Sequence, residues 1–268
     1  LGSGTRNSTS LVTSFLAGGC AVGGAINAFV QGGNAFGVPA VLGTNDAQPL
    51  TIQSNGTSAS MLLGTNGGLR MVLDAAAPTS PIYVAGSVYN VASAGAYGAT
   101  IAGGGRIGTW CWGGDNAHPG PCGNVATQPF ATIGGGYANY VGQGTSSSYA
   151  VIAGGTGNYA KADYATIGGG VENRAFARAA VVAGGGGNTV SGVASVVGGG
   201  GSNELQASYS VIGAGYYNRV DLGADYATIA GGNLNTVRGA HGVVGGGLQN
   251  TADGARSAVI GGANNVAS

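Results

Sequence analysis

The chain has 268 residues, 58 of them Gly, and its 9 basic and 9 acidic residues balance to a net charge of zero. This much Gly argues against a fold of long helices, because Gly in a helix interior costs backbone entropy. A hydrophobic content of 44% without excess charge excludes a disordered chain. The neutral balance predicts no nucleic-acid partner, since phosphate binding requires a basic surface.

The first segment, residues 1–32, is apolar and rich in Gly. Within it, residues 11–30 carry no charge and are long enough to span a membrane. Their many Gly, Ala, Ser and Thr residues give a low apolar density for a spanning helix. We therefore expect no membrane insertion by this segment.

Residues 33–98 predict a small β region that leads into the rest of the chain. Short apolar runs at 50–52, 61–63 and 69–73 are separated by Asn-Gly and Asn-Gly-Gly. Asn-Gly between apolar runs is a strong signal for a β-hairpin.

A repeat of about 15 residues governs residues 99–268. The anchor of each repeat is the apolar residue before a glycine run: Ile101, Ile133, Ile152, Ile167, Val182, Val197, Ile212, Ile229, Val244 and Ile260. Six residues after the anchor comes an Asn in eight repeats: Asn139, Asn158, Asn173, Asn188, Asn203, Asn218, Asn235 and Asn250. In the last repeat, Asn265 comes one place early.

Fifteen residues with one glycine run suit two short strands and two turns. Gly and Asn both tolerate the left-handed region of backbone space, so we expect them at the corners of a coil. Stacked coils pair each strand with its equivalent in the next repeat. The sequence thus predicts an all-β parallel β-solenoid.

The two halves of the coil differ in polarity. After the Asn, polar and apolar residues alternate, as in a strand with one wet and one buried face. The glycine half carries no charge in residues 131–137, 179–187 and 258–264, which is typical of a strand buried on both faces. A thin coil covers one face, so we infer a closed homo-oligomer with these strands at its axis, and rings of several orders remain open.

Residues 257–268 (SAVIGGANNVAS) and 194–208 (ASVVGGGGSNELQAS) carry a family resemblance. They resemble the head repeats of trimeric autotransporter adhesins of the YadA type, whose coils follow S-V-A-I-G-x-x-S-x-A-x-G. They are also similar to the glycine-rich haemagglutinin-like repeats of bacterial surface proteins and phage tail fibres. Residues 32–57 resemble the segment that precedes such repeats in fibre proteins. The resemblance implies a left-handed parallel β-roll in a homotrimer. Its extracellular location would be a bacterial cell surface or a virion tail fibre.

Residues 106–124 interrupt the repeat, where the anchor spacing is 32, or two repeats plus two. The interruption holds Trp110, Trp112, His118, Cys111 and Cys122. The two cysteines flank a Pro/Gly-rich turn and are expected to close the loop with a disulfide. The exposed aromatic residues would contact a receptor; alternatively, the tryptophans cap the roll or fill a gap between chains.

A second candidate surface lies three places before the anchor. Tyr149, Tyr164, Tyr209 and Tyr226 occupy this place, together with Phe130 and His241. Equivalent places in stacked coils are neighbours, so these residues predict an aromatic stripe. The stripe is either structural or a glycan-binding surface.

Other chemistry is sparse in this chain. With Asn at the corners and few acids, we expect no structural calcium; no His/Cys set has zinc spacing, so we expect no metal and no cofactor. Nucleophile and metalloprotease motifs are missing, although a carboxylate pair formed across chains stays open. We expect a non-enzymatic fibre or adhesin head that attaches to a host surface protein or glycan. The alternative is a purely structural shaft or filament subunit without its own receptor site.

Overall fold

The fold is all-β. A computed structural model describes residues 60–64, 70–74, 82–87, 89–93, 95–105, 122–142 and 147–268, and it contains no helix within them. The chain divides into two units, residues 1–53 and 54–268, and all described residues belong to the second. The apolar segment 1–32 and the run at 50–52 lie outside the described residues.

The described chain begins with three antiparallel strands. β1 (Ser60–Gly64) pairs with β2 (Arg70–Asp74), and β2 pairs with β3 (Ile82–Gly86). The hairpin expected from the apolar runs around Asn-Gly-Gly is therefore confirmed. β3 then pairs in parallel with the next strand of the same sheet, which joins the antiparallel strands to a stack of coils.

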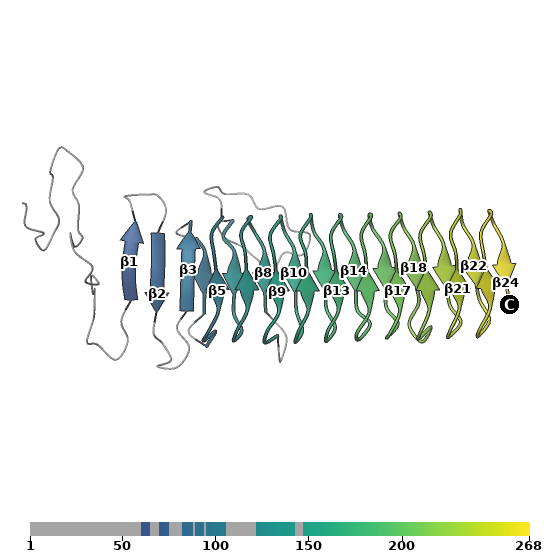
Figure 1. The fold of residues 1–268 in the computed structure, drawn as a ribbon, viewed down its shortest axis with the longest axis horizontal. Coiled ribbons are helices and arrows are strands. Elements are labelled where there is room, and N and C mark those ends of the chain that lie inside the picture. The colour runs from purple at the N-terminus through teal and green to yellow at the C-terminus, as the bar shows by residue number, and fades with distance from the viewer. Residues whose placement is uncertain are drawn as a thin grey trace, which may run out of the picture. The chain divides into compact units, whose positions relative to one another are not determined.

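Residues 82–268 form a parallel β-solenoid in which the two strands of each coil belong to two sheets (Figure 1). The first sheet continues from β3 through β5 (Thr100–Ile101), β7 (Thr132–Ile133), β9 (Val151–Ile152), β11 (Thr166–Ile167), β13 (Val181–Val182), β15 (Val196–Val197), β17 (Val211–Ile212), β19 (Thr228–Ile229), β21 (Val243–Val244) and β23 (Ala258–Val259). The second sheet contains β4 (Val91–Ala92), β6 (Val125–Ala126), β8 (Tyr140–Val141), β10 (Tyr159–Ala160), β12 (Arg174–Ala175), β14 (Thr189–Val190), β16 (Glu204–Leu205), β18 (Arg219–Val220), β20 (Thr236–Val237), β22 (Thr251–Ala252) and β24 (Val266–Ala267). The predicted solenoid is confirmed.

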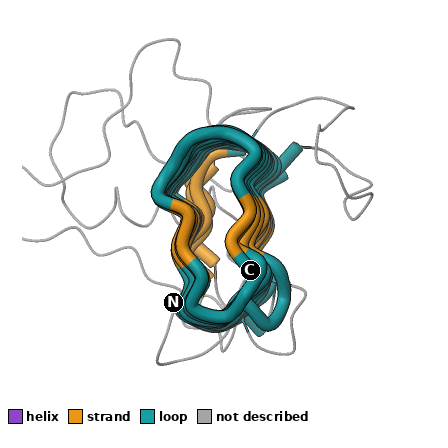
Figure 2. The backbone as a smooth tube through the Cα atoms, turned by 90° about the vertical axis from the view of Figure 1, so that its right-hand side faces the viewer, coloured by secondary structure: helices purple, strands orange, loops and turns teal. Residues whose placement is uncertain are grey.

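Seen along the stack, the strands of the two sheets face each other across a narrow interior (Figure 2). A glycine-rich turn, such as residues 168–173, leads from the first sheet to the second and is called the glycine turn here. A shorter turn, such as residues 161–165, returns to the first sheet and is called the tyrosine turn. The second residue of nearly every two-residue strand points inward, and these Ile, Val, Leu and Ala side chains form the core.

A row of buried asparagines runs through the core beside the glycine turn. The Nδ2 group of Asn188 donates to the carbonyl oxygens of Gly184 in its own coil and Gly200 in the next, each at 3.0 Å. The Oδ1 atom of Asn188 accepts from the backbone N–H and from Nδ2 of Asn203, each at 3.0 Å. Each asparagine therefore ties its coil to the next one, and we call the row the asparagine ladder.

The expectation that these asparagines adopt left-handed backbone is wrong. From Asn139 to Asn265, the residue before each of these asparagines has the positive φ, for example 55° at Glu172, 51° at Ser202 and 67° at Gly187. The reason is that the Asn side chain must point inward to reach the neighbouring coils. The preceding residue therefore makes the reversal of the chain.

The stack also begins earlier than the predicted boundary at residue 99. Tyr83 and Val84 of β3 pair with Thr100 and Ile101, so the first coil starts at β3. Asn90 lies six residues after Val84 and belongs to the ladder, because its Oδ1 accepts the backbone N–H of Asn124 at 2.8 Å. The repeat pattern missed both Asn90 and Asn124.

The described strands on either side of the interruption at 106–124 belong to neighbouring coils. Ile101 pairs directly with Ile133, and Val91 with Val125. A spacing of 32 where a regular coil takes 15 leaves 32 − 15 = 17 added residues. Asn124 returns the chain to the ladder, because its Nδ2 donates to the carbonyl oxygens of Gly103 and Gly136.

The last anchor was placed one residue too late. Val244 pairs with Val259, which is 7% exposed, whereas Ile260 is 82% exposed. Asn265 is then six residues after its anchor, as in the other coils. The irregularity predicted for the last repeat does not exist. The sequence pattern could not distinguish Val259 from Ile260 as the anchor, because both are apolar and adjacent.

Candidate binding surface

The outer face of the first sheet lacks charge in every described coil. Its outward residues are Thr100, Thr132, Val151, Thr166, Val181, Val196, Val211, Thr228, Val243 and Ala258. Two places further along each coil comes Ala or Gly, and Ile260 in the last coil. In the single chain this face is open rather than buried, with Val211 40% and Val243 37% exposed.

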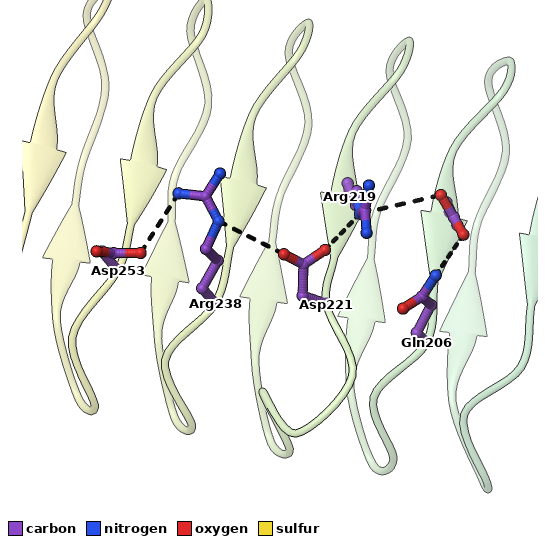
Figure 3. A network of polar contacts seen from close by, with 6 residues as sticks. Gln206, Arg219, Asp221, Arg238 and Asp253 are labelled. Carbon is purple, nitrogen blue, oxygen red and sulfur yellow. Dashed lines mark hydrogen bonds and ion pairs between the residues drawn. The ribbon is translucent and has the colours of Figure 1, made fainter.

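The outer face of the second sheet carries the polar residues, as the alternation predicted. Toward its C-terminal end, Arg219 lies between Glu204 of the preceding coil and Asp221 of its own coil (Figure 3). The Arg238 guanidinium contacts Asp221 at 3.5 Å and Asp253 at 3.3 Å. Each exposed ion pair contributes little to the stability of the fold on its own. The alternation of acidic and basic residues keeps this part of the outer face nearly neutral.

The predicted aromatic stripe exists along the tyrosine turn. Phe130, Tyr149 and Tyr164 form one stack of near-parallel rings, with centroids 4.8 and 5.4 Å apart. Tyr209, Tyr226 and His241 form a second stack, with centroids 5.2 and 5.0 Å apart. Ala179 and Ala194 occupy the two coils between the stacks, so the stripe is interrupted.

The stacking limits what the stripe can bind. Tyr149, Tyr164, Tyr209 and Tyr226 are 49–55% exposed, but neighbouring rings in each stack cover one another's faces. A sugar ring packs against the face of an aromatic ring, and here neighbouring rings already occupy those faces within each stack. Every stripe residue also has a positive φ, between 55° and 63° for the four tyrosines. These contacts favour a mainly structural role for the stacked rings.

The glycine turn exposes a second set of large side chains. Val171, Leu234 and Leu248 are 52%, 44% and 42% exposed, and they lie on the turn that joins the first sheet to the second. Tyr216 and Tyr217 lie in the same turn with ring centroids 4.3 Å apart. The side-chain hydrogen bond with Tyr217 raises the pKa of Tyr216 above its ordinary value.

The predicted receptor loop lies largely outside the described residues. Trp110, Trp112, His118 and Cys111 belong to that part of the chain, so their predicted roles stay predictions. Cys122 is described, and it is disulfide-bonded and buried. Its partner is Cys111 or Cys20, the other two cysteines of the chain, and the pairing with Cys111 stays a prediction.

The structure offers no metal centre in its described part. No group of three or more His, Cys, Asp or Glu residues comes close enough there to hold an ion. None of the described segments is a helix long and apolar enough to cross a membrane.

Sequence analysis missed a group of cationic and aromatic residues on the second sheet. Lys161, Arg174 and Arg178 lie in two neighbouring coils, next to Tyr159 and Phe176. The signal was present in the sequence, because Lys161 and Phe176 are one period apart. The group can be recognised once the coils are aligned in register, because equivalent places in other coils carry acidic residues next to the basic ones.

The fold and these surfaces define a β-solenoid repeat protein with one charge-free and one polar face. No protein-family model matches the chain, and a search of curated proteins finds no match either. The adhesin and tail-fibre resemblance therefore rests on the repeat pattern alone.

Proposed function

We propose that this chain is a non-enzymatic, extracellular fibre or adhesin head. In this proposal, three copies assemble as left-handed β-rolls with their first sheets at a common axis. The second sheets and tyrosine turns then face outward and present a rigid surface for attachment to a host surface protein or glycan. The site of action is a bacterial cell surface or a virion tail fibre, as the resemblance implies.

The observation that carries the proposal is the separation of the two faces. From β5 to β23, the outward row of the first sheet consists of Thr, Val and Ala alone. The second sheet places Arg174, Glu204 and Arg219 at the equivalent outward positions. A charge-free face of this length on an otherwise polar solenoid is typical of a surface that another chain covers.

The area of the outer face of the first sheet indicates whether this face alone could form the proposed subunit interface. Ten strands spaced about 4.8 Å apart, with outward rows about 10 Å wide, give roughly 430 Å². A stable interface takes about 800 Å² per partner. The flat face is too small alone, so we include Val171, Leu234 and Leu248 of the adjoining glycine turn in the contact.

Subunit counting tests the assembly. We expect native mass spectrometry and light scattering of the full chain to give three copies. Val196→Asp introduces a charge on the outer face of β15 and should dissociate the trimer. Thr189→Asp is the matched control, because it introduces the same charge on the outer face of β14 in the second sheet. A monomeric parent chain, or equal dissociation by both variants, would overturn the proposed assembly.

The alternative function is a structural shaft without a receptor site of its own. The two functions share the trimer and differ in attachment. A glycan array and a cell-binding assay with the labelled parent chain separate them. A trimer that binds neither glycans nor cells supports the shaft, whereas specific retention on either supports the adhesin.

A further inference from the structure

The described cations of the solenoid fall into two groups. Arg219 is paired with Glu204 of the preceding coil and with Asp221 of its own coil, and Arg238 is paired with Asp221 and Asp253 of the coils on either side. Lys161, Arg174, Arg178 and Arg256 form no ion pair with any of the residues that the structure describes, and Arg256 lies several coils away from the other three. Arg174 and Arg219 occupy the same outward row of the second sheet, so the contrast does not come from a difference in position.

These three cations lie together because of the register between two coils. Tyr159 of β10 pairs with Arg174 of β12, which places Lys161 beside Phe176. The Lys161 Nζ atom is 5.9 Å from the centroid of the Phe176 ring. Arg178 follows on the tyrosine turn, where its guanidinium is 6.0 Å from the centroid of the Tyr164 ring.

Aromatic rings, rather than acids, lie beside the charged groups of Lys161 and Arg178. The Tyr159 ring meets the Phe176 ring edge to face, with centroids 5.7 Å apart. Cation–π contacts orient a cation without neutralising its charge. We call Lys161, Arg174, Phe176 and Arg178 the cationic cluster.

The acids of the same coils do not neutralise the cluster. Asp163 accepts the backbone N–H of Ser148 at 2.7 Å, which directs its carboxylate toward the preceding coil. Glu172 lies in the glycine turn, at the opposite end of β12 from Arg178. The next coil places uncharged Thr189 and Ser191 beside Arg174 and Phe176.

We propose that the cationic cluster binds an acidic glycan. Lys161, Arg174 and Arg178 would pair with the carboxylate or sulfate groups of the sugar, because guanidinium and ammonium groups form strong charge-assisted hydrogen bonds with such anions. Phe176 offers apolar ring surface to the sugar between those charges. This proposal rests on the attachment function proposed above and names the class of ligand.

The extent of the cluster favours a short acidic glycan over a long polyanion. The positive charge covers two coils, and the acid Glu204 follows in the same row two coils further along. A nucleic acid requires a continuous basic surface, which a chain of zero net charge does not provide. In a trimer, three equal clusters would strengthen attachment to a glycan-coated surface by multivalency.

The test measures binding of the full chain to two acidic probes and one neutral probe by biolayer interferometry. The probes are a heparin oligosaccharide for sulfate, a hyaluronan oligosaccharide for carboxylate, and a dextran oligosaccharide. We expect at least one acidic probe to bind, and dextran not to bind. Arg174→Gln should weaken that binding roughly tenfold, as the loss of a charge-assisted hydrogen bond implies. Arg178→Gln should have a similar effect.

Arg256→Gln is the matched control, because Arg256 is exposed and lacks a described ion pair but lies several coils away. No binding of either acidic probe, or an equal loss in the Arg256→Gln variant, would overturn the proposal. The cell-binding assay separates this failure from failure of the attachment function. If the parent chain and Arg174→Gln attach equally well to cells, the acidic-glycan site is wrong and attachment stands; if the parent chain does not attach, attachment itself is wrong.

Discussion

Removing one member of the asparagine ladder tests what holds the coils in register. Asn188 lies in the middle of the stack, is fully buried, and takes part in five side-chain hydrogen bonds. Asn188→Ala leaves the buried backbone N–H of Asn203 without its acceptor and the carbonyl of Gly184 without its donor. An unsatisfied buried group costs about 1–3 kcal/mol, and the carbonyl is partly accessible to water, so we expect a loss of about 2–4 kcal/mol.

Urea unfolding followed by circular dichroism measures this loss. Thr189→Ala, at the next residue, changes an outward side chain without a described side-chain hydrogen bond and should cost less than about 1 kcal/mol. Asn188→Asp keeps the shape but loses the two donors, and places a charge against carbonyl oxygens, so it should cost more than Asn188→Ala. The reasoning is refuted if Asn188→Ala and Thr189→Ala shift the unfolding midpoint equally.

One deletion and two pairs of substitutions test the geometry of the coils by thermal unfolding. Deletion of residues 107–123 joins Arg106 to Asn124, restores the spacing of six between anchor and Asn, and should leave the fold intact; loss of the cooperative transition would contradict the assigned register. Gly170→Ala should unfold at a lower temperature than Gly184→Ala, because a Cβ at Gly170 would overlap the next coil at a φ of 91°, whereas Gly184 has open space. Val259→Asp should destabilise the last coil far more than Ile260→Asp, since Val259 alone points inward.

The fold was largely predictable because a solenoid repeats its chemistry at a fixed spacing. Ile152, Ile167 and Val182 are each 15 residues apart and pair with one another in the first sheet. A sequence pattern of this kind fixes the register without any long-range information. The hairpin was predictable for the same local reason, since Asn-Gly-Gly lies between two apolar runs.

The role of the asparagines was not predictable from spacing. A fixed place in the coil is equally consistent with an Asn in a left-handed turn and with an Asn whose side chain points inward. The structure distinguishes them, since Asn173 accepts from the N–H of Asn188 at 3.1 Å while Glu172 takes the positive φ. Hydrogen bonds between neighbouring coils determine that the Asn side chain points inward, and the sequence of a single repeat does not show these bonds.

The cationic cluster was missed for a related reason. Trp110, Trp112 and the tyrosines are recognisable as candidate binding residues in the sequence alone, because each is a large aromatic residue in a chain of mostly small ones. Arg174 becomes notable only in comparison with Arg219, which occupies the same row and has acidic neighbours. Lys161 becomes notable in comparison with Arg238, which occupies the equivalent place in its coil and contacts Asp221 and Asp253. The absence of a described partner is a property of the aligned coils and not of any single segment.

In a stack of coils, each row of equivalent side chains has one structural environment, because equivalent residues lie about 4.8 Å apart along the axis. The inward row of the first sheet must stay apolar and the ladder must stay Asn, so neither can vary to recognise a ligand. The outer face of the first sheet carries no charge and suits contact with identical copies. The outer row of the second sheet is the one whose residues change freely, from Tyr159 to Arg174 to Thr189 to Glu204. We therefore expect the recognition proposed above to involve that row or the turns beside it, and Arg174 of the cationic cluster is a residue of that row without a described ion pair.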